Sequence, residues 1–293
     1  MKLIWPWQDR RRRFSALKAT GFALTFAPAL YLFYQLRSGE FGIYPMWLGG
    51  LTYWSGVWAT WVLLAALAVT PALTITGFRR LVDVRRMIGV AALVYTIAHL
   101  IVYFALRLWN FAFIAKETAT SPSLIAATLS TIGLLALGMT SLDAAIERMG
   151  ARGWQRLHNT VYVVTFLAIL HLLLSRGNNP MQYLLTGAFF WLMVWRWLER
   201  RKLGTDPRAL AALAVGSSLF AALLEAIWVW VRRGYPLSET LGNNFTLIFG
   251  MPPAWELLAV GLLVALIAGL PALRFPVRRA TVVSEETNPA LPT

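Results

Sequence analysis

Residues 89–106, GVAALVYTIAHLIVYFAL, form an apolar stretch that contains one histidine, His99. Because an α-helix rises about 1.5 Å per residue, roughly 20 such residues cross the hydrocarbon core of a bilayer. An imidazole in this setting must find a partner, so ionisable residues inside membrane helices are candidates for functional sites. The stretch therefore predicts a membrane-spanning helix that carries a functional histidine.

Similar apolar stretches recur along the 293 residues, and the chain as a whole is too apolar for an ordinary soluble domain, with 58% hydrophobic and 14% charged residues. Only helices and closed barrels satisfy the backbone in lipid, and these runs have the length of helices. We predict an all-α, multi-pass transmembrane bundle of about eight helices. The predicted spans cover about residues 15–36, 51–76, 87–107, 123–142, 157–175, 181–197, 208–231 and 255–273.

Most Lys and Arg residues lie near the two termini and in alternate loops between the predicted spans. Cytoplasmic loops carry such an excess, so we expect both termini to be cytoplasmic. Residues 1–14 then form a basic cytoplasmic N-terminus and residues 274–293 a cytoplasmic tail. The net charge of +14 follows this topology and suits lipid headgroups, so we expect the bilayer and no nucleic acid as a partner.

The chain has three histidines, His99, His158 and His171, and no cysteine, which excludes thiolate ligation, iron–sulfur clusters and covalently attached haem. Along their predicted helices, His99 lies about 18 Å and His171 about 21 Å from the cytoplasmic start. Both helices are predicted to run outward, so the two imidazoles reach similar depths and could hold one haem iron between them. The alternative is that each histidine merely forms a hydrogen bond to a neighbouring helix.

His158 lies about 20 Å below His171 along the chain if the helix is continuous. It could bind a second haem near the cytoplasmic side, although the third span offers only Arg85, Arg86 or Met87 at that depth. It could equally serve as a polar residue at headgroup level. We expect the basic side chains at this entrance to receive haem propionates, an anionic flavin or a donor protein; they are Arg85, Arg86, Arg152 and Arg156. Glu225, a charged residue inside the seventh predicted span, is expected to pair with an arginine, although it could also mark a proton route.

The motifs in the central part of the chain form a pattern that is similar in order and spacing to the MsrQ (YedZ) family, which belongs to the ferric-reductase-like membrane cytochromes. The resemblance covers roughly residues 45–200. The motifs are Thr70-Pro71, Arg85-Arg86 with Gly89, His99, Lys116-Glu117, Thr140-Ser141, Met149-Gly150, Trp154 with Leu157-His158, Val161-Tyr162 and His171.

This resemblance implies a haem b electron-transfer subunit of a bacterial inner membrane rather than a complete enzyme. Its acceptor would be a periplasmic molybdenum-containing methionine sulfoxide reductase, and its donor a cytoplasmic flavin reductase or a membrane quinol, with FMN as a further cofactor. The predicted spans leave no stretch for a doubly wound flavin domain of about 100 residues, which fits a separate donor. Residues 15–200 would form the haem-binding domain, and 201–273 add two helices that the family pattern does not explain.

Two other functions stay open at this stage. A stand-alone reductase could pass electrons from the outer haem directly to ferric iron or oxygen. A proton-coupled transporter could instead use the buried histidines and Glu225 as a proton relay, although no inverted repeat or broken helix pair is visible in the sequence.

Overall fold

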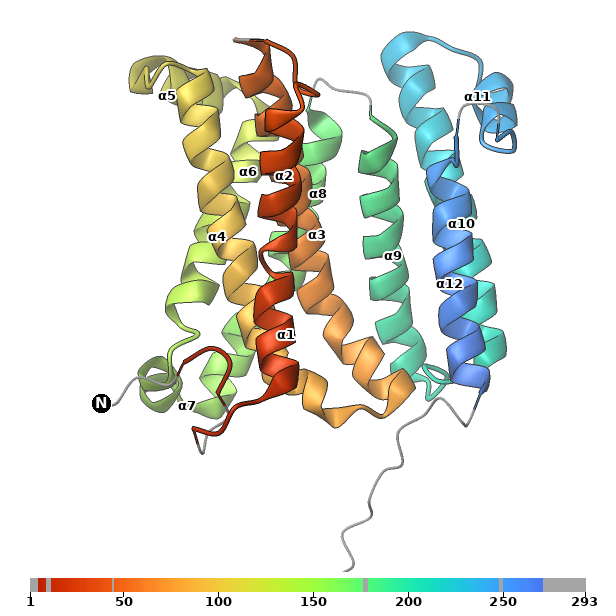
Figure 1. Cartoon of the computed structure of the whole chain (residues 1–293). Coiled ribbons are helices and arrows are strands. Elements are labelled where there is room, and N and C mark those ends of the chain that lie inside the picture. Colours follow the sequence, from red (N-terminus) through yellow and green to blue (C-terminus); the bar gives the residue numbers. More distant parts are fainter. Residues whose placement is uncertain (1–4, 9–11, 44, 176–178, 248–249, 271–293) are drawn as a thin grey trace, which may run out of the picture.

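The computed structural model describes residues 5–8, 12–43, 45–175, 179–247 and 250–270, and every regular element among them is a helix. The predicted all-α bundle is therefore confirmed (Figure 1). The helices are α1 (Ala16–Leu24), α2 (Ala27–Arg37), α3 (Met46–Thr76), η1 (Arg79–Leu81), α4 (Val82–Leu106), α5 (Phe111–Thr120), α6 (Pro122–Met139), α7 (Asp143–His158), α8 (Val161–Leu174), α9 (Pro180–Arg200), α10 (Pro207–Arg233), α11 (Leu237–Asn243) and α12 (Pro253–Gly269). The predicted tail 274–293 lies outside the described residues.

A helix occupies each predicted span, and the long helices alternate in direction through the bundle (Figure 1). Six segments of the described chain are long and apolar enough to cross a membrane, namely 16–37, 46–76, 79–106, 122–139, 144–174 and 207–233. The sixth predicted span corresponds to α9, and the eighth corresponds to the 17-residue α12. Both helices run beside the six segments in the bundle (Figure 1). The chain is a multi-pass membrane protein.

The first predicted span is divided into α1 and α2 at Thr25–Phe26. Pro28 lacks a backbone N–H and cannot continue the hydrogen-bond ladder of α1. The hydroxyl of Tyr95, from α4, enters the gap: it donates to the carbonyl of Thr25 at 2.6 Å and accepts from the amide of Ala29 at 3.1 Å. These are the two groups that an unbroken helix would join to each other, so a side chain from α4 satisfies the break.

The fifth predicted span also differs from the structure. His158 is the last residue of α7, and α8 begins only at Val161, after Asn159 and Thr160. The hydroxyl of Thr160 donates to the carbonyl of Leu157 at 2.7 Å, so a local side-chain bond competes with the helical ladder at this turn. His158 and His171 therefore lie on two consecutive helices of one membrane-crossing segment, 144–174, and not on one regular helix as the predicted span 157–175 implied.

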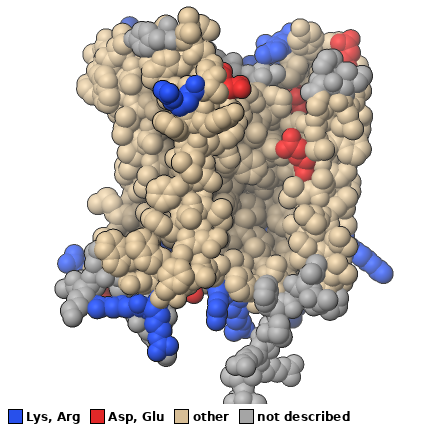
Figure 2. Space-filling model, in the orientation of Figure 1, with Lys and Arg blue, Asp and Glu red and all other residues tan. Residues whose placement is uncertain are grey.

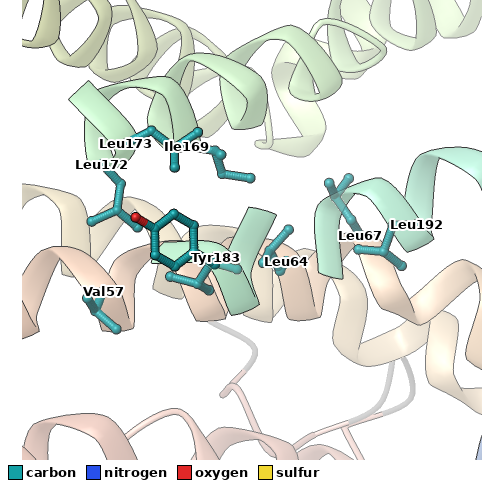
Figure 3. Packing of buried hydrophobic residues seen from close by; sticks show 9 residues of the cluster. Val57, Leu64, Leu67, Ile169, Leu172, Leu173, Tyr183 and Leu192 are labelled. Carbon is teal, nitrogen blue, oxygen red and sulfur yellow. The ribbon is translucent and has the colours of Figure 1, made fainter. Parts of the chain in front are cut away.

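The long helix α3 forms the centre of the bundle and packs against α4, α8 and α9. A buried cluster joins three of these helices, as Figure 3 shows; its members are Val57, Leu64, Leu67, Ile169, Leu172, Leu173, Tyr183, Leu185 and Leu192. In contrast, α10 packs mainly against α12 and α9. The C-terminal helices are thus joined to the rest of the bundle largely through α9.

Positively charged residues distinguish the two ends of the bundle. The end at which α1 begins and α12 ends, called the basic end below, also holds α7 and the start of α4 (Figure 1). Figure 2 shows Lys and Arg side chains clustered there, below a broad band without charge. The opposite end holds α5 and α11. This separation matches the distribution of charges expected from the sequence.

Candidate functional site

His99 and His171 meet between α4 and α8 towards the end of the bundle opposite the basic end. The centroids of the two rings are 6.4 Å apart, with an angle of 64° between the ring planes. The two residues are separated by 72 positions in the sequence, so only the packing of the bundle brings them together. The structure thus places the two histidines at one depth, as the topology argument required.

The imidazole of His99 is fixed by α3. Its Nδ1 lies 2.9 Å from the carbonyl oxygen of Thr52 and 3.1 Å from the hydroxyl of Ser55. The Ser55 hydroxyl itself donates to the same Thr52 carbonyl at 3.0 Å. Since a carbonyl can only accept, Nδ1 carries the proton and Nε2 keeps its lone pair.

His171 is fixed in the same way by α6. Its Nδ1 lies 3.0 Å from the carbonyl oxygen of Ser123 and 2.9 Å from the Ser123 hydroxyl. That hydroxyl donates to the backbone carbonyl of His171 at 3.0 Å. The proton is again on Nδ1, so both rings present a Nε2 that can bind a metal.

The spacing of the pair suits a metal ion held between two imidazoles. Metal–nitrogen bonds of about 2 Å, with each nitrogen roughly 1 Å from its ring centre, would put the two centroids about 6 Å apart. Among the described residues, however, no three His, Asp or Glu side chains gather as a metal site. A metal bound here would need its remaining ligands from a cofactor, and the porphyrin nitrogens of a haem supply four. The residues therefore fit a six-coordinate haem iron.

Gly56 provides the space that the His99 ring occupies. A Cβ atom at this position would lie 2.9 Å from Cε1 and 3.1 Å from Nδ1 of His99, closer than such contacts are normally found. Small residues at helix interfaces allow membrane helices to approach closely. In this protein, the small residue also allows the ring to lie directly against α3.

His158 lies at the other end of the protein, near the basic end, and its surroundings differ. Its ring stacks on that of Trp154, with centroids 4.0 Å apart, and Nε2 is 3.4 Å from the Thr140 hydroxyl. The indole of Trp154 donates to the backbone carbonyl of Thr140 at 3.0 Å. The structure does not pair His158 with another histidine, so its role as a second haem ligand stays a prediction.

The four arginines predicted at the cytoplasmic entrance are exposed at the basic end, two at the start of α4 and two on α7; they are Arg85, Arg86, Arg152 and Arg156. The segment assigned to a loop from the sequence is largely the helix α7, which is interrupted at Gly150, where φ is +68°. A positive φ of this kind favours glycine. The role of these arginines in binding propionates, flavin or a donor stays a prediction.

Two arginines have partners that the sequence did not indicate. Arg196, near the end of the sixth predicted span, belongs to α9 and donates to the carbonyls of Leu192 and Leu67 at 2.8 and 3.1 Å. It thereby ties α9 to α3. Arg107, at the opposite end, forms an ion pair with Glu117.

The expected arginine partner of Glu225 is not found: within the described chain, its carboxylate accepts a hydrogen bond from Asn244 at 3.2 Å.

A helical membrane bundle that holds two imidazoles close together, each with its Nδ1 on a backbone carbonyl, is of the kind found in membrane proteins that bind a metal cofactor. Comparison with known families assigns the chain more closely. Residues 55–169 match the family described as "Ferric reductase like transmembrane component". The chain belongs to the MsrQ family, as its relatives show.

The relatives include two proteins named "Protein-methionine-sulfoxide reductase heme-binding subunit MsrQ". The one from Azospira oryzae is 34% identical over 67% of this chain and 84% of its own length. The one from Caulobacter vibrioides is 33% identical over 60% of this chain and 84% of its own length. Magnetosome protein MamZ of Paramagnetospirillum magneticum is 30% identical over 62% of this chain and 28% of its own length. No solved structure matches the chain.

Proposed function

We propose that this protein carries electrons across the membrane through a haem b whose iron is bound by His99 and His171. The single observation that carries the proposal is the close pair of imidazoles. Their ring centroids are 6.4 Å apart, and the Nδ1–H of each ring donates to a backbone carbonyl. The relatives named as haem-binding subunits support it independently. When bound, the haem would supply a one-electron carrier, and its binding by both His99 and His171 would favour electron transfer over oxygen binding.

The protein's own residues would determine how this carrier behaves. Thr52 and Ser55 on one side, and Ser123 on the other, hold the imidazoles in one tautomer and one orientation. Groups that hydrogen-bond to a metal ligand in this way raise the basicity of the ligand and fix the orientation of its ring. A site that is rigid in this way suits rapid electron exchange, because little has to move when the charge changes.

The charge distribution supports an orientation of the protein in the membrane, and the donor and acceptor then define the direction of electron transfer. We assign the basic end to the cytoplasm and the histidine pair to the periplasmic side of a bacterial inner membrane. The donor would be a cytoplasmic flavin reductase, with FMN, or a membrane quinol. The acceptor would be a methionine sulfoxide reductase, as the names of the relatives suggest. The family resemblance further implies that this reductase is periplasmic and contains molybdenum. A second haem at His158 would shorten the path between the two faces.

The experiment that tests this function follows reoxidation of the reduced protein. The purified full chain is reduced anaerobically and mixed with the methionine sulfoxide reductase of the same organism and a methionine sulfoxide substrate. We expect the haem bands to reoxidise rapidly only when both are present. Equally fast reoxidation by ferric citrate or oxygen alone would contradict the dedicated conduit and support the stand-alone reductase. A protein without haem bands would contradict both.

A further inference from the structure

A helix from the C-terminal part of the chain reaches the end of the helix that carries His171. Arg232, in the last turn of α10, donates from its Nη2 to the backbone carbonyl of Leu174 at 3.2 Å. Leu174 is the last residue of α8, three positions after His171. The family match ends at residue 169, before α9 and α10 begin. A helix that the family match does not include therefore contacts the last turn of α8.

The last turn of α8 needs such a contact, because the last four carbonyls of a helix have no partner within it. In a membrane protein, a carbonyl without a donor is costly. Arg232 supplies a donor for Leu174, and a positive charge at the C-terminal end of a helix is also favourable for the helix dipole. The carbonyl of His171, in the same turn, accepts from the hydroxyls of Ser175 at 2.7 Å and Ser123 at 3.0 Å. Side chains from α6 and α10 thus hold the same turn of α8.

The guanidinium of Arg232 is itself held in place by α10. It lies over the ring of Trp228, one helical turn earlier, with 4.9 Å between its central carbon and the ring centre. Arginine stacks well on an aromatic face, and its planar fork is then pre-oriented for hydrogen bonding. Trp228 and Leu224, a further turn back, pack against the buried cluster of Figure 3, which includes Leu172 and Leu173. One face of α10 thus packs against the cluster to which the residues after the histidine belong, and Arg232 lies at the end of this face.

We propose that Arg232 positions the haem ligand His171 by fixing the last turn of α8. The proposal rests on the function proposed above, in which His171 binds the haem iron. Ser123 sets the direction of the imidazole, and Arg232 limits the movement of the backbone from which the imidazole extends. A bound metal requires its ligands within roughly 0.5 Å of their productive positions, so both contacts matter. In this way α10 serves the haem site through α8.

The neighbouring Arg233 allows the contact to be separated from the charge. It carries the same charge on the same helix, but its side chain lines the cavity between α10, α11 and α12. Within the described part of the chain, only Arg232 of these two arginines donates a hydrogen bond to α8. Arg233→Gln therefore removes a charge at the same end of the bundle and leaves the contact with Leu174 intact. It is the matched control for Arg232→Gln, which removes both the charge and the contact.

The first test needs no haem. Hydrogen–deuterium exchange of the full chain in detergent, depleted of haem, measures the amides of residues 171–175, among them the Ser175 amide that donates to the carbonyl of His171 at 3.0 Å. Loss of one hydrogen bond from this turn is expected to raise their exchange about threefold or more in Arg232→Gln, while Arg233→Gln exchanges like the wild type. Equal exchange in all three proteins, or an equal increase in both variants, would overturn the proposal.

The second test reports the position of the ligand on the haem. In a low-spin ferric haem with two imidazole ligands, the g-values of the electron paramagnetic resonance spectrum depend on the angle between the two ring planes. We expect shifted or broadened g-values in Arg232→Gln at unchanged haem content, and wild-type g-values in Arg233→Gln. Wild-type g-values in Arg232→Gln would contradict the positioning role alone. A wild type without a low-spin signal would contradict the proposed function, and with it the role of Arg232.

Arg232→Lys replaces Arg232→Gln if that variant does not fold. Lysine keeps the charge but lacks the planar fork that stacks on Trp228 and reaches the carbonyl of Leu174. We expect faster exchange and altered g-values, both to a smaller extent than predicted for Arg232→Gln, with Arg233→Lys as the control. If Arg232→Lys matches the wild type in both measurements, the proposal is wrong.

Discussion

The two ends of this bundle hold histidines in different ways. Towards the end opposite the basic end, which is the outer end in the proposed orientation, His99 and His171 lie close together, and each has its Nδ1 within 3.0 Å of a backbone carbonyl on a neighbouring helix. Near the basic end, His158 stacks on Trp154 and has a 3.4 Å contact with a hydroxyl. The comparison shows that depth in a membrane helix is not enough to define a ligand. A ligand pair also needs neighbouring helices that orient both rings.

The largest expected effect is the loss of either outer histidine. His99→Ala and His171→Ala remove one axial ligand each, and we expect the haem bound in the outer site to fall at least about tenfold. The absorbance of the haem bands per mole of purified protein measures this. If either variant retains the haem content and spectrum of the wild type, that histidine does not bind haem, and the contrast between the two ends of the bundle is wrong.

His158→Ala should have a smaller effect on the outer site, because its ring lies near the other end of the protein. We expect the spectrum of the outer haem to persist. If His158 binds a second haem, the haem-to-protein ratio should fall from about two to about one, consistent with its position on α7. A loss as complete as that in His99→Ala would abolish the distinction between the two ends.

Gly56→Ala tests the close contact between α3 and the His99 ring. Alanine favours a helix over glycine by about 1 kcal/mol, so the helix itself should not suffer. The added methyl would press on Cε1 and Nδ1 of His99, and we expect a shifted haem spectrum and weaker haem retention. Gly49→Ala, in the same helix, is the matched control, since a Cβ there meets no atom within 4 Å. Identical spectra for the two variants would argue against the contact.

Ser123→Ala should have the smallest effect. It removes the hydroxyl beside His171 but leaves the backbone carbonyl of residue 123 as an acceptor for Nδ1. Loss of a group that hydrogen-bonds to a metal ligand commonly lowers metal affinity about 10–100-fold. Because the carbonyl is retained here, we expect the affinity for haem to fall less than about tenfold. Titration of haem into the haem-depleted protein gives the value. A loss as large as that in His171→Ala would mean that the hydroxyl, not the carbonyl, fixes the ring.

The sequence predicted the helical class, the positions of the spans and the meeting of His99 with His171, because hydropathy, loop charge and helical rise are local properties. It could not predict Ser55, Gly56 or Ser123, which matter only once α3 and α6 are placed beside the histidines. The sequence gives one hint of these residues, because small residues recur in the apolar spans. Many helix interfaces have this feature, so it does not single out the residues beside the histidines.

The remaining errors have similar causes. The break between α1 and α2 depends on Tyr95 reaching in from another helix, although Pro28 signals its position. The break after His158 depends on one threonine side chain. The partner of Glu225 is Asn244, the residue that follows α11, and no sequence periodicity links it to α10. The contacts of Tyr95 and Glu225 join segments that only tertiary packing brings together, whereas the contact of Thr160 is local.

Low-temperature electron paramagnetic resonance of the oxidised, purified protein tests the central claim most directly, because it reports the axial ligands of a ferric haem. With His99 and His171 both bound, the iron is six-coordinate, and we predict a low-spin ferric signal in the wild type that is lost in His171→Ala. A wild-type spectrum dominated by high-spin ferric haem, or a low-spin signal that persists unchanged in His171→Ala, would contradict the account.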